Sequence, residues 1–282
     1  MSEAIKSLEE VRREIDEIDA ALHDLIMRRT RVVEQVMAAK GTTNTGNFIP
    51  GREIKVLRGL MDRHEGAFPR QALIRMWREM ISVFAAMQGP FHVVACAKGG
   101  EQGCWDMARD YFGLHEKMST LATPREVVSS VSSDEAAIGV VSVPAEGDDD
   151  AWWRVLGGAV APRIVARLPF IEGSNARTGG VGAYVLAKLE FDPTGDDRTL
   201  LVVETEFELS KADLLRQVTN ANLTPQLAVT DRSDGAAHLI EVDGFVETDD
   251  EPVRKLMDLD EVRSVLLIGS YGVPVQAGGV LA

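Results

Sequence analysis

The sequence predicts a multidomain protein: an all-α N-terminal region, an α/β middle region and a C-terminal βαββαβ unit. Three observations predict this order. Apolar residues recur at helical spacing up to residue 88, short apolar runs then alternate with helical segments, and the last third alternates strands and helices as βαββαβ. We place the domains at residues 1–90, 91–190 and 191–282.

Composition narrows the class of protein. The chain has 282 residues, enough for two or three domains, and its hydrophobic fraction of 45% is ordinary for a soluble globular protein. No apolar run reaches membrane-spanning length and the N-terminus lacks a signal-peptide core, so we expect a cytoplasmic protein without a membrane partner. Two cysteines, Cys96 and Cys104, are too few for a disulfide framework or a zinc site.

The charge is uneven along the chain. The net charge of −14 argues against nucleic acid as a partner. Residues 1–90 carry 14 Lys/Arg and 13 Asp/Glu, a net charge of +1, whereas the remaining 192 residues carry 16 and 31, a net charge of −15. The N-terminal region is therefore the better place for a small anionic ligand.

The first predicted helix runs from Leu8 to Lys40 without Pro or Gly. Ser7 suits the N-cap, and Gly41 follows the last residue as a stop signal. At a rise of 1.5 Å per residue such a helix is about 50 Å long. A helix of this length usually packs against a partner chain, which predicts a homodimer through the N-terminal helices.

Two further helices complete the N-terminal region. A turn-rich connection leads to a second helix that opens at Arg52 and ends near Gly66. The third helix runs from about Pro69 to Gln88, where Gly89 and Pro90 stop it.

The cations of the first helix are placed unusually. Arg29 and Lys40 are eleven residues apart, about three turns, so both project from one face among apolar neighbours. Arg12 lies seventeen residues before Arg29, about 25 Å along the axis. One small ligand can reach all three only if Arg12 comes from an antiparallel neighbour, most simply a second subunit. Any one of these cations alone is more often a solvated surface residue.

The run from Val11 to Lys40 resembles the first helix of the all-helical chorismate mutases. The matching positions are Arg12, Asp19, Arg29 and Lys40, and the resemblance covers residues 8–88. It implies conversion of chorismate to prephenate in aromatic amino-acid biosynthesis, a pericyclic rearrangement that needs no cofactor or metal. Such a reaction needs a dicarboxylate held in a compact conformer and stabilisation of charge on the breaking ether oxygen.

The resemblance also implies which side chains bind the substrate. Six residues are implied: Arg12 of the partner subunit, Arg29, Lys40, Arg52, Glu53 and Gln88. Arg12 and Arg29 would hold the two carboxylates, with Arg52 in support. Lys40 and Gln88 would donate to the ether oxygen, and Glu53 would accept from the ring hydroxyl. Without the other matches, Arg52 and Glu53 are equally well explained as surface residues. The family tends to carry Asp three residues before Arg52, where this chain has Ile49.

The middle region is predicted to contain alternating strands and helices that form a parallel α/β layer. Its glycines 99, 100 and 103 lack dinucleotide-binding spacing, and residues 174–182 are predicted as a mobile link. Trp152 and Trp153 are neighbours on a predicted helix, so we expect them not to share one core. Residues 137–146 resemble a Val-Pro segment of prephenate dehydratases. Gly182, Ala183 and Tyr184 stand where that family has Thr-Arg-Phe, so we expect dehydratase activity to be lost.

The C-terminal order βαββαβ over residues 198–275 is that of the split ferredoxin-like unit. It resembles an ACT domain, a small-molecule-sensing module, and its ending at residues 266–275 resembles the closing strand in prephenate dehydratases. The phenylalanine-binding segments of that family are replaced by residues 210–214 and 226–229, which leaves the identity of any amino-acid effector open. The layout is that of bifunctional mutase–dehydratases. A bifunctional enzyme and a non-catalytic dimeric sensor are the alternatives to a mutase.

Overall fold

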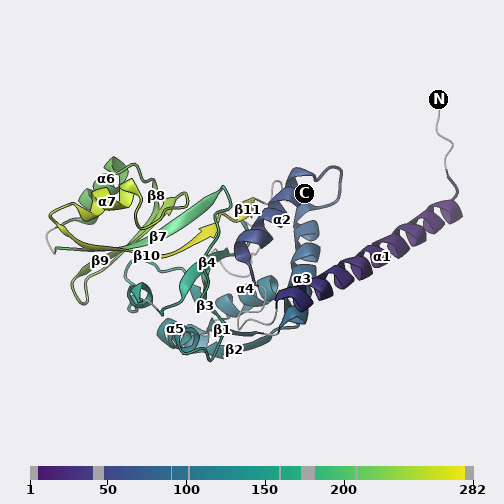
Figure 1. The fold of residues 1–282 in the computed structure, drawn as a ribbon, viewed down its shortest axis with the longest axis horizontal. Helices are drawn as coiled ribbons and strands as arrows, with labels where there is room; N and C mark the ends of the chain where they lie inside the picture. Colours follow the sequence, from purple (N-terminus) through teal and green to yellow (C-terminus); the bar gives the residue numbers. More distant parts are fainter. Residues whose placement is uncertain are drawn as a thin grey trace.

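The computed structural model describes residues 6–40, 48–89, 91–100, 102–158, 160–172, 182–206 and 209–276. One long helix projects from a body in which two shorter helices lie beside a large sheet (Figure 1). The predicted link at residues 174–182 lies outside the described residues except for Gly182. None of the described helices is both long and apolar enough to span a membrane.

Three helices form the N-terminal region: α1 (Leu8–Lys40), α2 (Pro50–Asp62) and α3 (Arg70–Gln88). The bounds predicted for α1 are confirmed, and Ser7 caps it by accepting a hydrogen bond from the Glu10 amide at 3.3 Å. α2 begins two residues before the predicted Arg52, because Pro50 fits the first turn of a helix.

Nine described strands form one sheet in the order β2-β1-β3-β6-β4-β10-β7-β9-β8. Their bounds are β1 His92–Cys96, β2 Lys117–Leu121, β3 Ile138–Ser142, β4 Arg163–Leu168, β6 Ala183–Ala187, β7 Asp197–Thr205, β8 Pro225–Asp231, β9 Ala236–Asp243 and β10 Val262–Gly272. Two short strands, β5 (Ile171–Glu172) and β11 (Val275–Gln276), pair separately.

The middle region is only partly the predicted parallel layer. Strands β2, β1 and β3 are parallel, and α4 (Gly103–Phe112) and α5 (Pro124–Ser132) connect them. The prediction is wrong for β6, which is antiparallel to both β3 and β4. Antiparallel pairs need no crossover helix, and the described residues between β4 and β6 form no helix.

Trp152 and Trp153 also differ from the prediction that they do not share one core. They lie on a 3₁₀ segment, η2 (Trp152–Gly157), and both are buried in one cluster with residues of α5 and the sheet. The prediction that they cannot share a core is wrong, because η2 contacts α5, β7 and β10 and is therefore covered on more than one side. A second 3₁₀ segment, η1, spans Lys98–Gly100.

The C-terminal elements follow the predicted order: β7, α6 (Lys211–Asn220), β8, β9, α7 (Glu251–Met257) and β10. Ser210 is the N-cap residue of α6, where its side chain accepts a hydrogen bond from the Asp213 amide. The neighbour order β10-β7-β9-β8 is antiparallel throughout, and α6 and α7 pack against it around one apolar cluster. β10 also pairs with β4 at Gly269, where a Cβ would collide with the Ile164 backbone. The sheet is therefore continuous across the predicted boundary at residues 190 and 191.

The helix α2 is held by the C-terminal part of the chain. The Arg58 guanidinium donates to Thr194 Oγ1 at 2.8 Å, to the Asp196 carbonyl at 2.7 Å and to the Val273 carbonyl at 2.8 Å. A Cβ on Gly51 would lie 2.8 Å from the Asp192 carbonyl, so the helix and the loop approach closely. The position of α2 thus depends on residues far outside the helical region.

We expect Arg58→Ala to lower the free energy of unfolding by about 2–3 kcal/mol, because three bonds from one charged group are lost. Lys55→Ala, on an exposed position of the same helix, is the control and should change stability by less than about 0.5 kcal/mol. The measurement is urea unfolding followed by circular dichroism. Equal midpoints for the two variants would contradict the anchoring role.

Candidate active site

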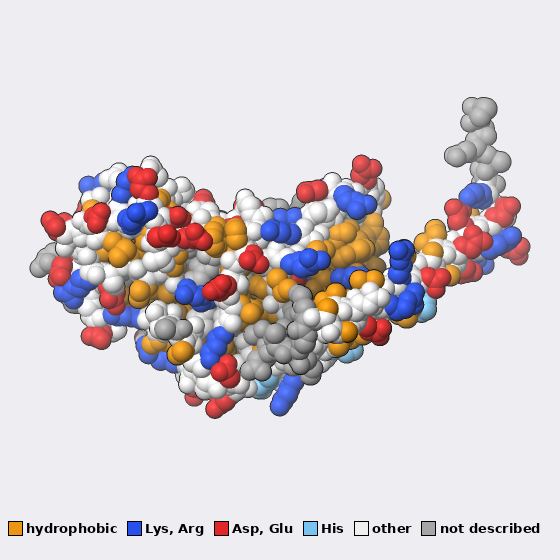
Figure 2. All heavy atoms as spheres, in the orientation of Figure 1, with side chains coloured by type: hydrophobic (Ala, Val, Ile, Leu, Met, Phe, Trp, Pro, Cys, Tyr) orange, Lys and Arg blue, Asp and Glu red, His pale blue; other side chains and the backbone are white. Residues whose placement is uncertain are grey.

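A cavity of about 480 Å³ lies where α1, α2 and α3 meet. Each helix contributes four lining residues: Arg29, Val32, Val33 and Val36 from α1, Ile49, Arg52, Glu53 and Val56 from the start of α2, and Ile81, Phe84, Ala85 and Gln88 from α3. Figure 2 shows hydrophobic side chains gathered where α3 meets α1, with Lys and Arg side chains beside them. Four of the six predicted site residues therefore line one cavity.

Arg29 provides a half-buried cation in this cavity. Its guanidinium carbon lies 4.3 Å from the centre of the Phe84 ring, a cation–π contact. Burial, and then the nearby charge of Arg52, lower the pKa of Arg29 from its ordinary value. Among the described residues, its buried Nη1 has no hydrogen-bond partner. Two like charges with an unpaired donor between apolar walls favour an anionic ligand.

Glu53 is the buried acid of the cavity. Its Oε2 lies 2.5 Å from Nη1 of Arg78 on α3 and accepts a hydrogen bond from the Tyr111 hydroxyl on α4 at 3.2 Å. Burial alone would lower the pKa of Arg78, but the adjacent Glu53 carboxylate outweighs it, so the pKa is raised. Glu53 is thus held by two residues behind the cavity wall.

Gln88 and Ile49 lie on the rim and the wall of the cavity. The Gln88 side chain, near the end of α3, donates from Nε2 to the Phe84 carbonyl at 2.8 Å. An amide group has two N–H donors, so the second is not used by this bond. Ile49 is the N-cap residue of α2, makes no side-chain capping bond and presents an apolar surface to the cavity.

The remaining predicted residues lie apart or beyond description. Lys40 ends α1, and its side chain lies outside the described part of the chain. Arg12 is exposed on the N-terminal half of α1 and is not among the residues that line the cavity. The helical rise places it about 25 Å from Arg29 along the axis. Within the described part of one chain, the predicted residues that line the cavity are therefore Arg29, Arg52, Glu53 and Gln88.

Comparison with known protein families matches the helical region that contains the cavity. Residues 11–89 match the family described as chorismate mutase type II. The intracellular chorismate mutase of Mycolicibacterium smegmatis is 32% identical over 78 residues, which are 27% of this chain and 75% of that protein. The chain belongs to the type II chorismate mutase family.

Longer relatives extend beyond this mutase region. A bifunctional chorismate mutase/prephenate dehydratase of Aquifex aeolicus is 29% identical over 145 residues, 49% of this chain and 39% of that protein. A protein of the same name from Stutzerimonas stutzeri is 29% identical over 150 residues, 51% of this chain and 40% of that protein. The chain thus spans about two fifths of the length of these relatives.

Solved structures are less similar. A prephenate dehydratase from Streptococcus mutans aligns with a TM-score of 0.44 and 14% identity, over 64% of this chain and 97% of that one. The quorum-quenching acylase GqqA aligns with a TM-score of 0.46 and 12% identity, over 64% and 95%. Likeness at this level assigns neither an activity nor a fold to the sheet region.

Two residues that contact Glu53 behind the cavity wall were missed by sequence reasoning. Arg78 falls on the buried stripe of α3 with Ile74 and Ile81, so a cation at this position was a detectable signal. Tyr111 gave no signal, because 58 residues separate it from Glu53 and only the tertiary fold joins them. Phe84 is buried and also carries the Arg29 contact.

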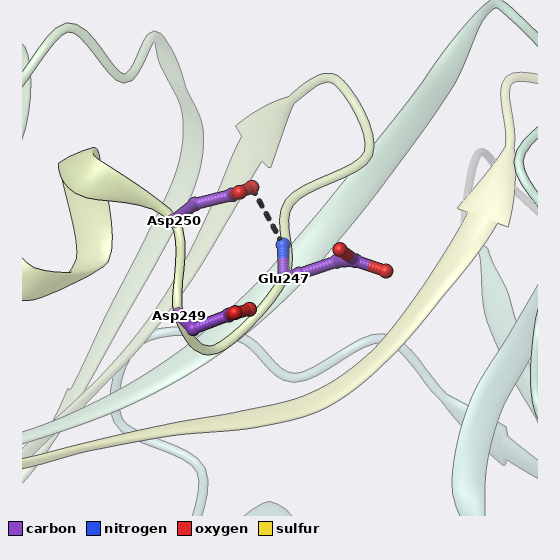
Figure 3. A group of neighbouring side chains, drawn as sticks. All are labelled: Glu247, Asp249 and Asp250. Atoms are coloured by element: carbon purple, nitrogen blue, oxygen red, sulfur yellow. Dashed lines mark hydrogen bonds between the residues drawn. The ribbon is translucent and has the colours of Figure 1, made fainter.

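A group of acids outside the mutase region has another explanation. Glu247, Asp249 and Asp250 place carboxylate oxygens within 4.8 Å of one another (Figure 3). Asp250 is the N-cap residue of α7, and its carboxylate accepts a hydrogen bond from the Glu247 amide at 2.8 Å. The cluster closes the turn that leads into α7, and we assign no metal to it.

Proposed function

We propose that the protein is an isomerase that converts chorismate to prephenate in the cavity between α1, α2 and α3. The observation that carries this proposal is that Arg29, Arg52, Glu53 and Gln88, from three different helices, line one cavity. The reaction needs positioning and preorganised electrostatics rather than a nucleophile or a cofactor. Two arginines in an apolar cavity supply both for a dicarboxylate.

The chemistry assigns a part to each group. Arg29 binds one carboxylate through its unpaired Nη1, and Arg52 lies close enough to add to the positive potential. Gln88 donates its second N–H to the ether oxygen, on which negative charge grows as the bond breaks, and Lys40 adds a cation there. A partner helix over the exposed apolar wall would exclude water, which would strengthen each of these interactions.

Glu53 accepts a hydrogen bond from the ring hydroxyl. Ile49 is apolar, so no second carboxylate at the start of α2 helps Glu53 to bind the ring hydroxyl. Glu53 therefore contributes more to binding the hydroxyl here than it would if position 49 were Asp.

The second carboxylate needs Arg12 from another copy of the chain. The apolar stripe of α1 is exposed over most of its length: Leu8, Val11, Ile15, Ile18, Leu22, Leu25, Ile26, Met27, Val32 and Val36. A contiguous apolar face of this extent marks an interface. An antiparallel α1 from a second subunit would cover it and bring the partner subunit's Arg12 toward Arg29, so we propose a homodimer.

The primary test is chorismate consumption by the purified protein, followed by ultraviolet absorbance. We expect turnover by the wild type, and a loss of about 10²-fold or more in kcat for Arg29→Ala or Lys40→Ala, because Arg29 positions a substrate carboxylate and Lys40 stabilises the charge on the ether oxygen. Both variants should keep the wild-type circular dichroism spectrum. Arg28→Ala, at an exposed neighbouring position, is the control and should retain activity. Wild-type kinetics in Arg29→Ala would remove the hypothesis, and an inert wild type would favour the sensor alternative.

Subunit mixing tests the shared site. In a mixture of Arg12→Ala and Arg29→Ala, half of the dimers are mixed and each mixed dimer has one intact site, so activity should recover to about one quarter of wild type. A mixture of Arg29→Ala and Lys40→Ala is the control and should recover nothing, since both residues come from the same chain of each site. Equal recovery in both mixtures, or none in the first, would contradict the swapped arrangement.

We propose that dehydratase activity is lost. Gly182 and Ala183 offer no hydroxyl and no cation, and the Tyr184 hydroxyl donates to buried Glu241 at 2.6 Å. The bifunctional alternative is favoured by the names of the longer relatives and by matches longer than residues 11–89. We expect no phenylpyruvate from prephenate at neutral pH, measured by absorbance in base. Its formation by the pure protein would establish the alternative.

We further propose that residues 198–275 form an ACT-like unit that binds an amino-acid effector. Its support is the element order and the strand order β10-β7-β9-β8, with α6 and α7 packed against the strands. We also propose that the chain divides into three domains at residues 90 and 190, and that the protein is cytoplasmic.

A further inference from the structure

We infer that Arg78 and Tyr111 are positioning residues that hold the Glu53 carboxylate at the mutase cavity, so that the α/β region supports the active site. This inference rests on the proposed mutase function. It concerns two residues that do not line the cavity, and one of them, Tyr111, lies outside the segment that matches the mutase family.

The geometry behind Glu53 carries the inference. Glu53 and Arg78 are 7% and 5% exposed, and their ion pair closes at 2.5 Å. The Tyr111 hydroxyl reaches the same Oε2 at 3.2 Å, and the Tyr111 carbonyl accepts from Arg78 Nη2 at 2.5 Å. Since both donors bind Oε2, the other carboxylate oxygen is the one that a ligand hydroxyl in the cavity would reach.

The surroundings make this arrangement rigid. The Arg78 guanidinium lies 3.8 Å from the centre of the Tyr111 ring. That ring packs against Phe48, Phe112 and Phe170 at centroid distances of 6.1, 4.8 and 5.5 Å. Tyr111 therefore has little freedom to rotate, and its hydroxyl restricts Glu53 in turn.

A purely structural role explains this pair less well. Replacing a buried ion pair by apolar residues is often neutral or stabilising, so packing alone gives little reason for charge here. A buried carboxylate that presents one oxygen to a ligand needs a charged partner at its other oxygen, because an unpaired buried charge is strongly destabilising. Arg78 supplies that charge and Tyr111 sets the direction of the oxygen.

The link also crosses the boundary of the mutase region. α3 and α4 are joined by the hydrogen bond from the Ser82 hydroxyl to the Phe112 carbonyl. A Cβ on Gly113, which has a φ of 75°, would lie 3.0 Å from the side chains of Glu79 and Ser82. The end of α4 is thus closely packed on α3, and the tyrosine cannot shift without moving the sheet region.

The test uses the full chain with Tyr111→Phe, which removes only the hydroxyl. We expect kcat/KM for chorismate to fall about 3- to 10-fold, the range for one lost hydrogen bond of ordinary strength. The loss should appear in KM more than in kcat, because the bond to the ring hydroxyl is made in the ground state as well as in the transition state. Tyr184→Phe is the matched control, because it also removes a buried hydroxyl from a carboxylate, Glu241, away from the cavity. Its kcat and KM should equal those of the wild type.

A double-mutant cycle separates positioning from stability. In a Glu53→Gln background, Tyr111→Phe should cause no further loss, because its only route to the substrate is through the carboxylate. Arg78→Lys should retain more activity than Arg78→Met. If Arg78→Met does not fold, the kinetics of Tyr111→Phe, alone and in the Glu53→Gln background, test the positioning role. Additive losses with Glu53→Gln, or an unchanged KM in Tyr111→Phe, would overturn this inference while leaving the mutase function standing. A wild type that does not consume chorismate would overturn both.

Discussion

The buried ion pair between Glu53 and Arg78 is the interaction on which the N-terminal region depends. It joins α2 to α3 at 2.5 Å, and the Tyr111 hydroxyl brings α4 to the same oxygen. Breaking such a pair by removing one partner leaves an uncompensated charge in the core, which is strongly destabilising. The acid that faces the cavity is therefore fixed by the packing of three helices, and α2 is fixed again from its other side by Arg58.

The cavity is electrostatically incomplete within one chain. Arg29 has an unpaired buried donor and lies close to a second cation, while the apolar stripe of α1 faces solvent. Unsatisfied donors and exposed apolar faces each cost free energy, and both costs fall when a ligand and a partner helix are present. In the proposed homodimer, the same helix would bind the substrate at one end and pack against its partner along its length.

Strand β10 joins the C-terminal unit to the middle region and also packs against α2. β10 pairs with β7 on one edge and with β4 on the other, so the C-terminal unit continues the sheet of the middle region. The end of β10 also meets α2, where a Cβ on Gly272 would lie 2.8 Å from Ile54. A change in the C-terminal unit therefore has a continuous route of packed backbone to the helix that carries Arg52 and Glu53.

Local patterns in the sequence determined the elements whose physics is local. Helical periodicity predicts α1 to the residue, Ser7 predicts its cap, and spacing with a family motif predicts four residues that meet at one cavity. Only the tertiary structure decided the direction of β6, the common burial of Trp152 and Trp153, and the approach of Tyr111 to Glu53. Each of these depends on contacts between segments far apart in the chain, and a pattern within one segment carries no information about what covers it.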